Sequence, residues 1–290
     1  MNKQIAGLLM GIAMAVSMAM PFVAAAPVQI GLSYSKDSDG LDSYSYSIGT
    51  EKEEKPLNFT VYQNRLVQSN TSINENMLLG KWVKTVSKKA NVTLWTGFLK
   101  NDIRDFISYS GMYDTEVRGD DHMWFSYGHD AVGTVLAHQN GISTNTTTFS
   151  YLHKPVEDVE MILKVEHTAY SDNNNQKKLD ISIAKHFSER LKLGVAYGYN
   201  SADYSASPVY YVPVQESTLS IVPQLAIPIG LGKVVLTGEK SLVADNSSGS
   251  ISRYSIATDV IFGNLSMGTK YFSEPAYSSR TWHMNWNHEW

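Results

Sequence analysis

Apolar and polar residues alternate along most of the chain after its first 25 positions. In one such segment Leu193, Val195 and Tyr197 alternate with Gly194 and Ala196. The same two-residue period recurs around residues 28–35, 43–48, 57–61, 160–166, 178–187 and 253–262. Successive side chains of a strand point to opposite faces, so each segment predicts a strand with one apolar and one polar face. Helical spacing is nowhere comparably strong beyond the N-terminal segment, which indicates an all-β fold.

The connections between these segments alternate between tight turns and longer polar loops. Tight turns are expected at His129 and Asp130 and at 188–190, 230–232 and 263–264, and longer loops at 36–40, 139–145, 171–176, 244–250 and 273–279. This rhythm predicts a single transmembrane antiparallel up-and-down β-barrel of about 16 strands, with 12 and 14 strands as alternatives. The strands are expected near residues 28, 42, 57, 75, 91, 115, 132, 145, 159, 178, 192, 212, 233, 250, 264 and 281.

Two stretches depart from the alternation. Residues 101–121 are rich in charge, which predicts a loop that lies either outside the barrel or folded into it. Residues 204–213 include Pro208 and Pro213, which disfavour a central strand, so a second loop is expected there. Its tyrosines are interpreted as part of an aromatic girdle, with stacking on a sugar as the alternative.

The first 25 residues have the organisation of a secretory signal peptide. Lys3 precedes the apolar run 5–16, and Val23 and Ala25 occupy positions −3 and −1 of a cleavage site. A retained membrane helix is the alternative interpretation. Cleavage leaves residues 26–290 as one domain without another apolar stretch of spanning length, which restricts the mature chain to an exported soluble protein or a β-barrel.

Residues 281–290 form the most strongly two-sided segment. One alternating set is Trp282, Met284, Trp286, His288 and Trp290, whereas the other set is wholly polar. The segment resembles the last strand of bacterial outer-membrane β-barrels, which typically ends in an aromatic residue, although His288 departs from the usual apolar choice. This resemblance implies that the three tryptophans lie at the membrane interface. It also implies the outer membrane of a diderm bacterium as the location, with its lipids and the barrel-insertion machinery as partners.

The amino-acid composition excludes some kinds of chemistry but does not identify a transported solute. The chain has no cysteine, which excludes disulfide and thiolate chemistry, and its net charge of −4 gives no reason to expect nucleic acid. A mean hydropathy of −0.22 suits a barrel, since only alternate residues face lipid. The 8 histidines are scattered without metal-binding spacing, so neither a metal nor a cofactor is expected.

The segment HQNGIS, from His138 to Ser143, loosely resembles the active-site stretch of the outer-membrane phospholipase A family. In that family a nucleophilic serine follows the histidine by two positions, but here that position is Asn140. Ser143 lies five residues after His138, in a region expected to turn, and a histidine activates a serine only within hydrogen-bond reach. We therefore predict no catalytic residues and no enzyme activity, with a lipid hydrolase using His138 and Ser143 as the alternative.

The polar faces of the strands are expected to line the interior of the barrel. The residues predicted there are Glu160, Lys164, Glu166, Lys178, Asp180, Lys192, Arg253, Asp259, Lys270, His283 and Glu289. Both signs of charge occur in comparable numbers, so no solute charge is indicated. Two interpretations stay open: opposed charges fill a polar core, or some of them line a water-filled path.

The N-terminal half carries QIGLSYSKDSDG, LDSYSYSIGTE, LNFTVYQNR and LLGKWVKTVSKKANVTLWTGFLKND in succession. This pattern resembles the YaiO-type outer-membrane β-barrels in strand order and spacing, over about half of the mature chain. The resemblance implies a role related to glycans. We expect a non-enzymatic channel or export-associated pore for small hydrophilic solutes or glycan chains, with a plugged barrel serving adhesion or envelope integrity as the structural alternative.

Overall fold

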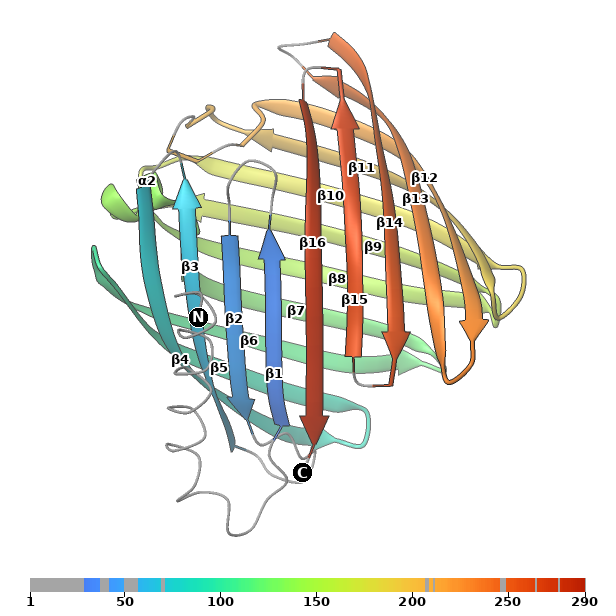
Figure 1. The fold of residues 1–290 in the computed structure, drawn as a ribbon, viewed down its shortest axis with the longest axis horizontal. Coiled ribbons are helices and arrows are strands. Elements are labelled where there is room, and N and C mark those ends of the chain that lie inside the picture. The colour runs from blue at the N-terminus through green and yellow to red at the C-terminus, as the bar shows by residue number, and fades with distance from the viewer. Residues whose placement is uncertain are drawn as a thin grey trace, which may run out of the picture.

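In this computed structural model, the described part of the chain contains sixteen strands and one short helix (Figure 1). Their bounds are β1 Gln29–Lys36, β2 Asp42–Gly49, β3 Leu57–Gln68, β4 Thr71–Ser87, β5 Ala90–Asn101, β6 Asp105–Arg118, β7 Asp121–Ala131, α2 Val135–Gln139, β8 Ser143–Val156, β9 Val159–Tyr170, β10 Asn175–His186, β11 Leu191–Ala202, β12 Gln215–Ile229, β13 Gly232–Asp245, β14 Gly249–Phe262, β15 Leu265–Glu274 and β16 Tyr277–Glu289. The structure describes the backbone of residues 29–36, 42–49, 57–68, 71–206, 209–210, 212–245, 249–263, 265–275 and 277–289, and side-chain surroundings within 71–284.

The strands form because their alternating residues meet two different environments. On β10 and β11 the side chains of Ile181, Ile183 and Val195 are exposed, whereas Gln176, on the opposite face, is buried. The same division holds for β4 to β16, where exposed large apolar side chains alternate with polar or small ones. An apolar surface of this extent is rare on soluble proteins and is the expected exterior of a membrane barrel. We call the opposite side of the sheet the polar face.

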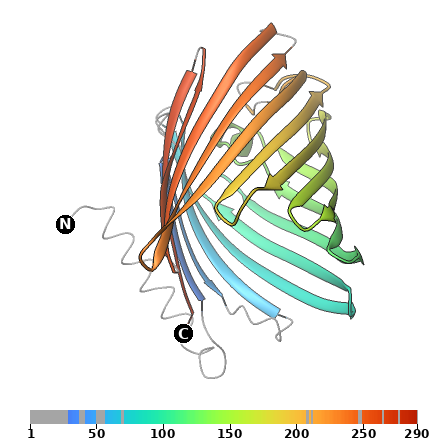
Figure 2. The ribbon, with the colours of Figure 1, turned by 90° about the vertical axis from the view of Figure 1, so that its right-hand side faces the viewer.

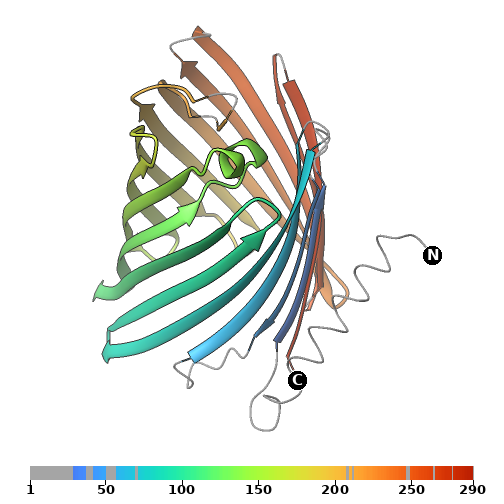
Figure 3. The same ribbon diagram turned by 90° about the vertical axis from the view of Figure 1, so that its left-hand side faces the viewer.

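All neighbouring strands pair antiparallel, which confirms the predicted all-β up-and-down fold. The hydrogen-bonded order is β2-β1-β16-β15 and then strand by strand back to β3. The first and last strands are therefore partners, with Gln29 opposite Glu289. The order ends at β2 and β3, which lie side by side without a backbone ladder between their described residues (Figure 1). Figures 2 and 3 show the resulting curvature: the green strands of mid-chain lie opposite the blue and red strands of its two ends.

Several tight turns and longer connections lie where the sequence predicts them. The longer loop expected at 273–279 is wrong, because β15 extends to Glu274 and β16 begins at Tyr277. The turn between β12 and β13 contains Gly230, whose φ of 54° favours glycine. The expected turn at His129 and Asp130 is wrong, because both residues lie in β7 and pair with Asn145 and Thr144 of β8. The chain reverses instead over residues 132–142, which hold α2.

The prediction of a loop over residues 101–121 is also wrong. β6 occupies most of this stretch and pairs with both β5 and β7. Its charges find partners at the polar face and at the strand end: Asp114 lies 3.7 Å from His122, and Glu116 lies 2.6 Å from Lys89. The charged residues of β6 alternate with apolar residues that are exposed on the opposite face of the sheet, and the charges made this alternation hard to recognise in the sequence.

The only helix in the described part of the chain is α2, which has five residues. None of the described helical structure is long and apolar enough to cross a membrane.

Candidate functional site

Charged side chains of β9, β10 and β11 pair with one another on the polar face. Glu166 lies between Lys164 and Lys178, with Nζ–Oε distances of 2.9 and 3.0 Å. Six residues earlier on β9, Glu160 accepts a 2.9 Å hydrogen bond from Lys192. His186 lies 3.6 Å from the same carboxylate oxygen. The opposite signs neutralise each other locally, which lowers the cost of holding charges within the sheet's concave side.

A second group of ion pairs joins β12, β14, β15 and β16. The guanidinium of Arg253 reaches Glu216 at 3.1 Å and Glu274 at 2.7 Å. Six residues further along β14, Oδ1 of Asp259 lies 2.7 Å from Nε2 of His283. These pairs connect four of the five strands from β12 to β16, with Arg253 and Glu216 joined across β13, so they fix the strands relative to one another as well as balancing charge.

Eight of the eleven residues predicted on the polar face take part in these pairs: Glu160, Lys164, Glu166, Lys178, Lys192, Arg253, Asp259 and His283. The side chain of Glu289 lies outside the described residues. The other two candidates with described side chains, Asp180 and Lys270, form no ion pair with a described residue. In the strand register, Asp180 lies opposite Lys164 and Gly198. Lys270 lies opposite Ala257 and Thr281. Sequence reasoning missed Glu216, Glu274 and His186. Glu216 continues the polar alternation of Thr218 and Ser220, and that signal could have found it.

The tryptophans of the last strand are only partly within the described structure. Trp282 is on the apolar face and 51% exposed. The backbone of Trp286 pairs with Leu32 and Leu265. The side chain of Trp286 and all of Trp290 lie outside the described residues.

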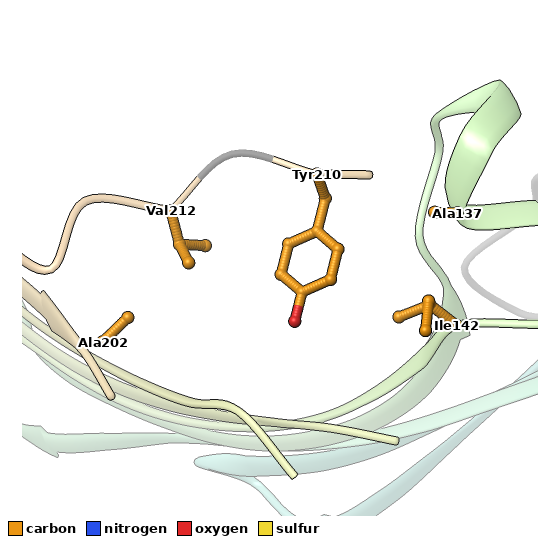
Figure 4. Packing of buried hydrophobic residues seen from close by; sticks show 5 residues of the cluster. All are labelled: Ala137, Ile142, Ala202, Tyr210 and Val212. Carbon is orange, nitrogen blue, oxygen red and sulfur yellow. The ribbon is translucent and has the colours of Figure 1, made fainter. Parts of the chain in front are cut away.

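Three connections meet at the sheet end opposite the paired ends Gln29 and Glu289. We call their described residues the cap: 132–142, 171–174, 203–206, 209–210 and 212–214. Their apolar side chains form a small core of Ala137, Ile142, Ala202, Tyr210 and Val212 (Figure 4). Figure 4 shows the Tyr210 ring pointing from its loop toward the strands between Ala202 and Ile142. The cap is therefore a packed structure in its own right rather than a set of independent loops.

Polar contacts fix the same loops. The hydroxyl of Tyr210 donates to the carboxylate of Asp172, with O–O distances of 2.7 and 2.9 Å, and its ring stacks on Tyr170 at 4.4 Å between centroids. The fully buried Asn174 donates to the backbone oxygen of Tyr204 at 2.8 Å. Thr134, which caps the N-terminus of α2, donates its hydroxyl to the backbone oxygen of Val209 at 2.7 Å. Residues far apart in sequence are thus joined across the cap.

The ionisation of Tyr210 gives a test of this packing. Burial, aided by the neighbouring Asp172 carboxylate, raises the pKa of Tyr210 above its usual value. A raised pKa in the folded state means that the neutral phenol stabilises the cap fully below the unfolded value of about 10, and that this stabilisation is lost as the pH rises further. In a spectrophotometric titration, the difference between wild type and Tyr210→Phe should be one tyrosine that ionises well above pH ~10. A difference curve centred on the ordinary tyrosine value would contradict the buried position.

His138 anchors the cap to the strands. Its side chain is buried, and Nε2 lies 2.7 Å from Oε1 of Glu75 on β4, in an ion contact that is not a well-aligned hydrogen bond. Its Nδ1 faces two donors, the side-chain amide of Asn101 at 3.2 Å and Nε of Arg104 at 3.3 Å. Because a guanidinium can only donate, Nδ1 is the acceptor and the ring proton is assigned to Nε2, toward Glu75. Arg104 completes the anchor by donating to the backbone oxygen of Ile142 at 2.7 Å.

This arrangement bears on the hydrolase alternative. Both ring nitrogens of His138 face Glu75, Asn101 and Arg104 rather than Ser143. Ser143 begins β8, and its backbone N–H donates to the hydroxyl of Ser171. His138 and Ser143 thus have separate partners in the structure. The described residues contain no group of three or more His, Asp or Glu placed to hold a metal ion.

The chain was compared with protein-family models, curated protein sequences and solved structures. No protein-family model matches the chain, and no curated protein sequence matches it. Among solved structures, a bacterial polysaccharide outer membrane secretin aligns over 90% of this chain and 98% of its own, with a TM-score of 0.70 and 10% identity. OccK11 of Pseudomonas aeruginosa aligns over 91% and 95%, with a TM-score of 0.55 and 8% identity. OccAB3 of Acinetobacter baumannii aligns over 92% and 100%, with a TM-score of 0.52 and 6% identity. The chain is therefore similar in fold to outer-membrane β-barrels.

Proposed function

We propose that this protein is an outer-membrane β-barrel that forms a channel for hydrophilic solutes. The observation that carries the proposal is the two-sided sheet, whose exposed apolar face would meet lipid while charged pairs such as Glu160 with Lys192 occupy the opposite face. The first strand of the chain pairs with its last, and the two edge strands of the sheet, β2 and β3, lie side by side, an arrangement that suits a barrel wall. In such a barrel the polar residues named above line the interior.

The comparisons support a transport role and suggest its cargo. One similar structure is described as a polysaccharide outer membrane secretin, which agrees with the resemblance to YaiO-type barrels in pointing toward glycan chains. We propose small hydrophilic molecules or glycan chains as the solute, and an export-associated role as the context. Delivery would follow cleavage of the signal peptide after Ala25, with Trp290 serving recognition by the insertion machinery and Trp282 and Trp286 lying at the lipid interface.

The cap favours a second candidate. Its loops pack together at one end, and an end closed in this way would make a plugged barrel with a structural or adhesive role. The two candidates differ only in whether solutes pass the cap.

Conductance separates these candidates. We expect purified protein inserted in a planar lipid bilayer to give discrete conductance steps, because the mixed charges of the interior would support a continuous column of water. Liposome swelling with neutral sugars should show the same permeability. A heat-denatured sample is the control. Absence of conductance from protein whose insertion is verified by protease protection would exclude the open channel and leave the plugged barrel.

A further inference from the structure

A cavity of about 460 Å³ lies against β4, β5, β6 and β7. Its wall includes the side chains of Met77, Leu79, Trp95, Ser108, Ser110 and Asp130. The strand register groups these residues on one face of the sheet. Trp95 lies opposite Ser110. Gly97 lies opposite Leu79 on one side and Ser108 on the other. The neighbouring positions Thr93 and Leu99 are buried, which identifies this as the polar face and not the exposed apolar one.

The cavity exists because small residues gather beside one large aromatic residue. Gly97, Ser108, Ser110 and Gly128 occupy adjacent places in the register. A Cβ atom at Gly97 would collide with the Ser108 hydroxyl, so a larger residue here would require the Ser108 side chain to turn away. The depression is thus bounded by Trp95 on β5 and by Asp130 on β7.

The groups around this depression suit a sugar ring. The apolar C–H face of a pyranose packs on an indole ring, and a tryptophan offers that surface together with a rigid geometry. Sugar hydroxyls donate to a carboxylate, which only accepts, and exchange hydrogen bonds with serine hydroxyls, which do both. The volume lies within the range of ligand sites, which are largely apolar with a few polar groups that fix orientation. Asp130, with Glu75 nearby on β4, makes the site unfavourable for an acidic sugar.

The cavity also lies where a passing solute would meet it. Asp130 is next to the connection 132–142 of the cap, and Met77 lies two residues from Glu75, which contacts His138. The cavity is therefore just below the anchored loop, at the capped end of the polar face.

We propose that this cavity is a binding subsite for an uncharged sugar ring of an oligosaccharide. The inference deepens the proposed function, on which it rests for the access of a glycan to the polar face. Within it Trp95 stacks on the ring, and Asp130 accepts hydrogen bonds from the hydroxyls.

Binding can be measured without any conductance. Purified full-length protein in detergent micelles is titrated with maltohexaose, and binding is followed by calorimetry and by tryptophan fluorescence. Trp95→Leu and Asp130→Asn should each raise the Kd by about tenfold, which corresponds to ~1.4 kcal/mol. Trp124→Leu is the matched control, because Trp124 lies on the same face of β7 but outside the cavity and stacks on His122. It should leave the Kd unchanged.

A second variant tests the cavity without removing a group from it. A Cβ at Gly128 would lie 3.4 Å from Cβ of Ser110, an ordinary contact, so Gly128→Val should fold while filling the space. Its affinity for maltohexaose should fall at least as far as that of Trp95→Leu. Circular dichroism of the β-sheet verifies folding of each variant.

The outcomes separate this subsite from the channel proposal. Trp95-dependent binding without conductance would support the subsite and contradict the channel. Conductance without maltohexaose binding, or with equal losses in Trp95→Leu and Trp124→Leu, would overturn the subsite and leave the channel intact. Hexagalacturonate is the acidic probe, and binding as tight as that of maltohexaose would overturn the assignment to uncharged sugars.

Discussion

Replacing Tyr210 with alanine is expected to release the cap. The side chain is 4% exposed, stacks on Tyr170 and donates to Asp172, so its removal leaves a void and an unmatched carboxylate. Truncation of a large buried aromatic residue costs about 3–5 kcal/mol. Because every 1.4 kcal/mol is a factor of ten, the population of the open cap should rise by at least about a hundredfold.

Amide hydrogen exchange measured by mass spectrometry reads out this change. Protection should fall in residues 203–206 and 212–214 and in residues 132–142, because the two loops share one core. Tyr204→Ala is the matched control: Tyr204 belongs to the same loop but is 41% exposed and joins the cap through one hydroxyl hydrogen bond, to the backbone oxygen of Asp172. Its loss should cost about 1 kcal/mol, well below the effect of Tyr210→Ala. Unchanged protection in Tyr210→Ala would show that the cap does not depend on this packing.

Removing His138 is expected to have an effect of similar size through electrostatics. His138→Ala would leave Glu75, which is 6% exposed, buried beside Arg104 without its closest contact. Leaving a buried polar group without its partner costs about 1–3 kcal/mol, and more when that group is charged, as the Glu75 carboxylate is. The connection 132–142 should therefore lose its protection from exchange, and single-channel recordings should show longer or larger openings.

A double-mutant cycle identifies the cause. Glu75→Gln removes the stranded charge, so adding it to His138→Ala should recover part of the lost stability, a non-additivity expected of residues in contact. His122→Ala is the control, because its pairing with Asp114 is partly exposed and should contribute less than about 1 kcal/mol. Additive losses from the two substitutions would contradict a coupled pair at this position.

Strand placement was readable from the sequence because it depends on a local, two-residue period. Residues 191–199 predicted β11 well, since nothing but alternation decides which face of a strand each side chain occupies. β6 was missed because charges at its strand end and polar face, such as Glu116 and Asp114, look like loop residues until their partners Lys89 and His122 are known. Those partners come from neighbouring strands and turns, which a local pattern does not contain.

The cap and the cavity could not be predicted from the sequence, because both are formed by contacts between residues far apart in the chain. His138 was considered for catalysis, whereas in the structure its ring contacts Glu75 and Arg104, which lie more than 30 residues earlier in the chain. Tyr210 was interpreted as part of a girdle, whereas it is buried against Tyr170. Likewise Trp95 and Asp130 reach one cavity only because β5, β6 and β7 align in a particular register.

The pairing of β1 with β16 has a consequence for biogenesis. The partners Gln29 and Glu289 come from opposite ends of the described chain, so closure requires nearly all of the polypeptide to have been synthesised. Until then a partly assembled sheet has unpaired edge strands and a large exposed apolar surface, and both features promote aggregation. Contacts of such long sequence separation also form slowly. We therefore expect aggregation to compete with folding during the interval in which β1 waits for β16.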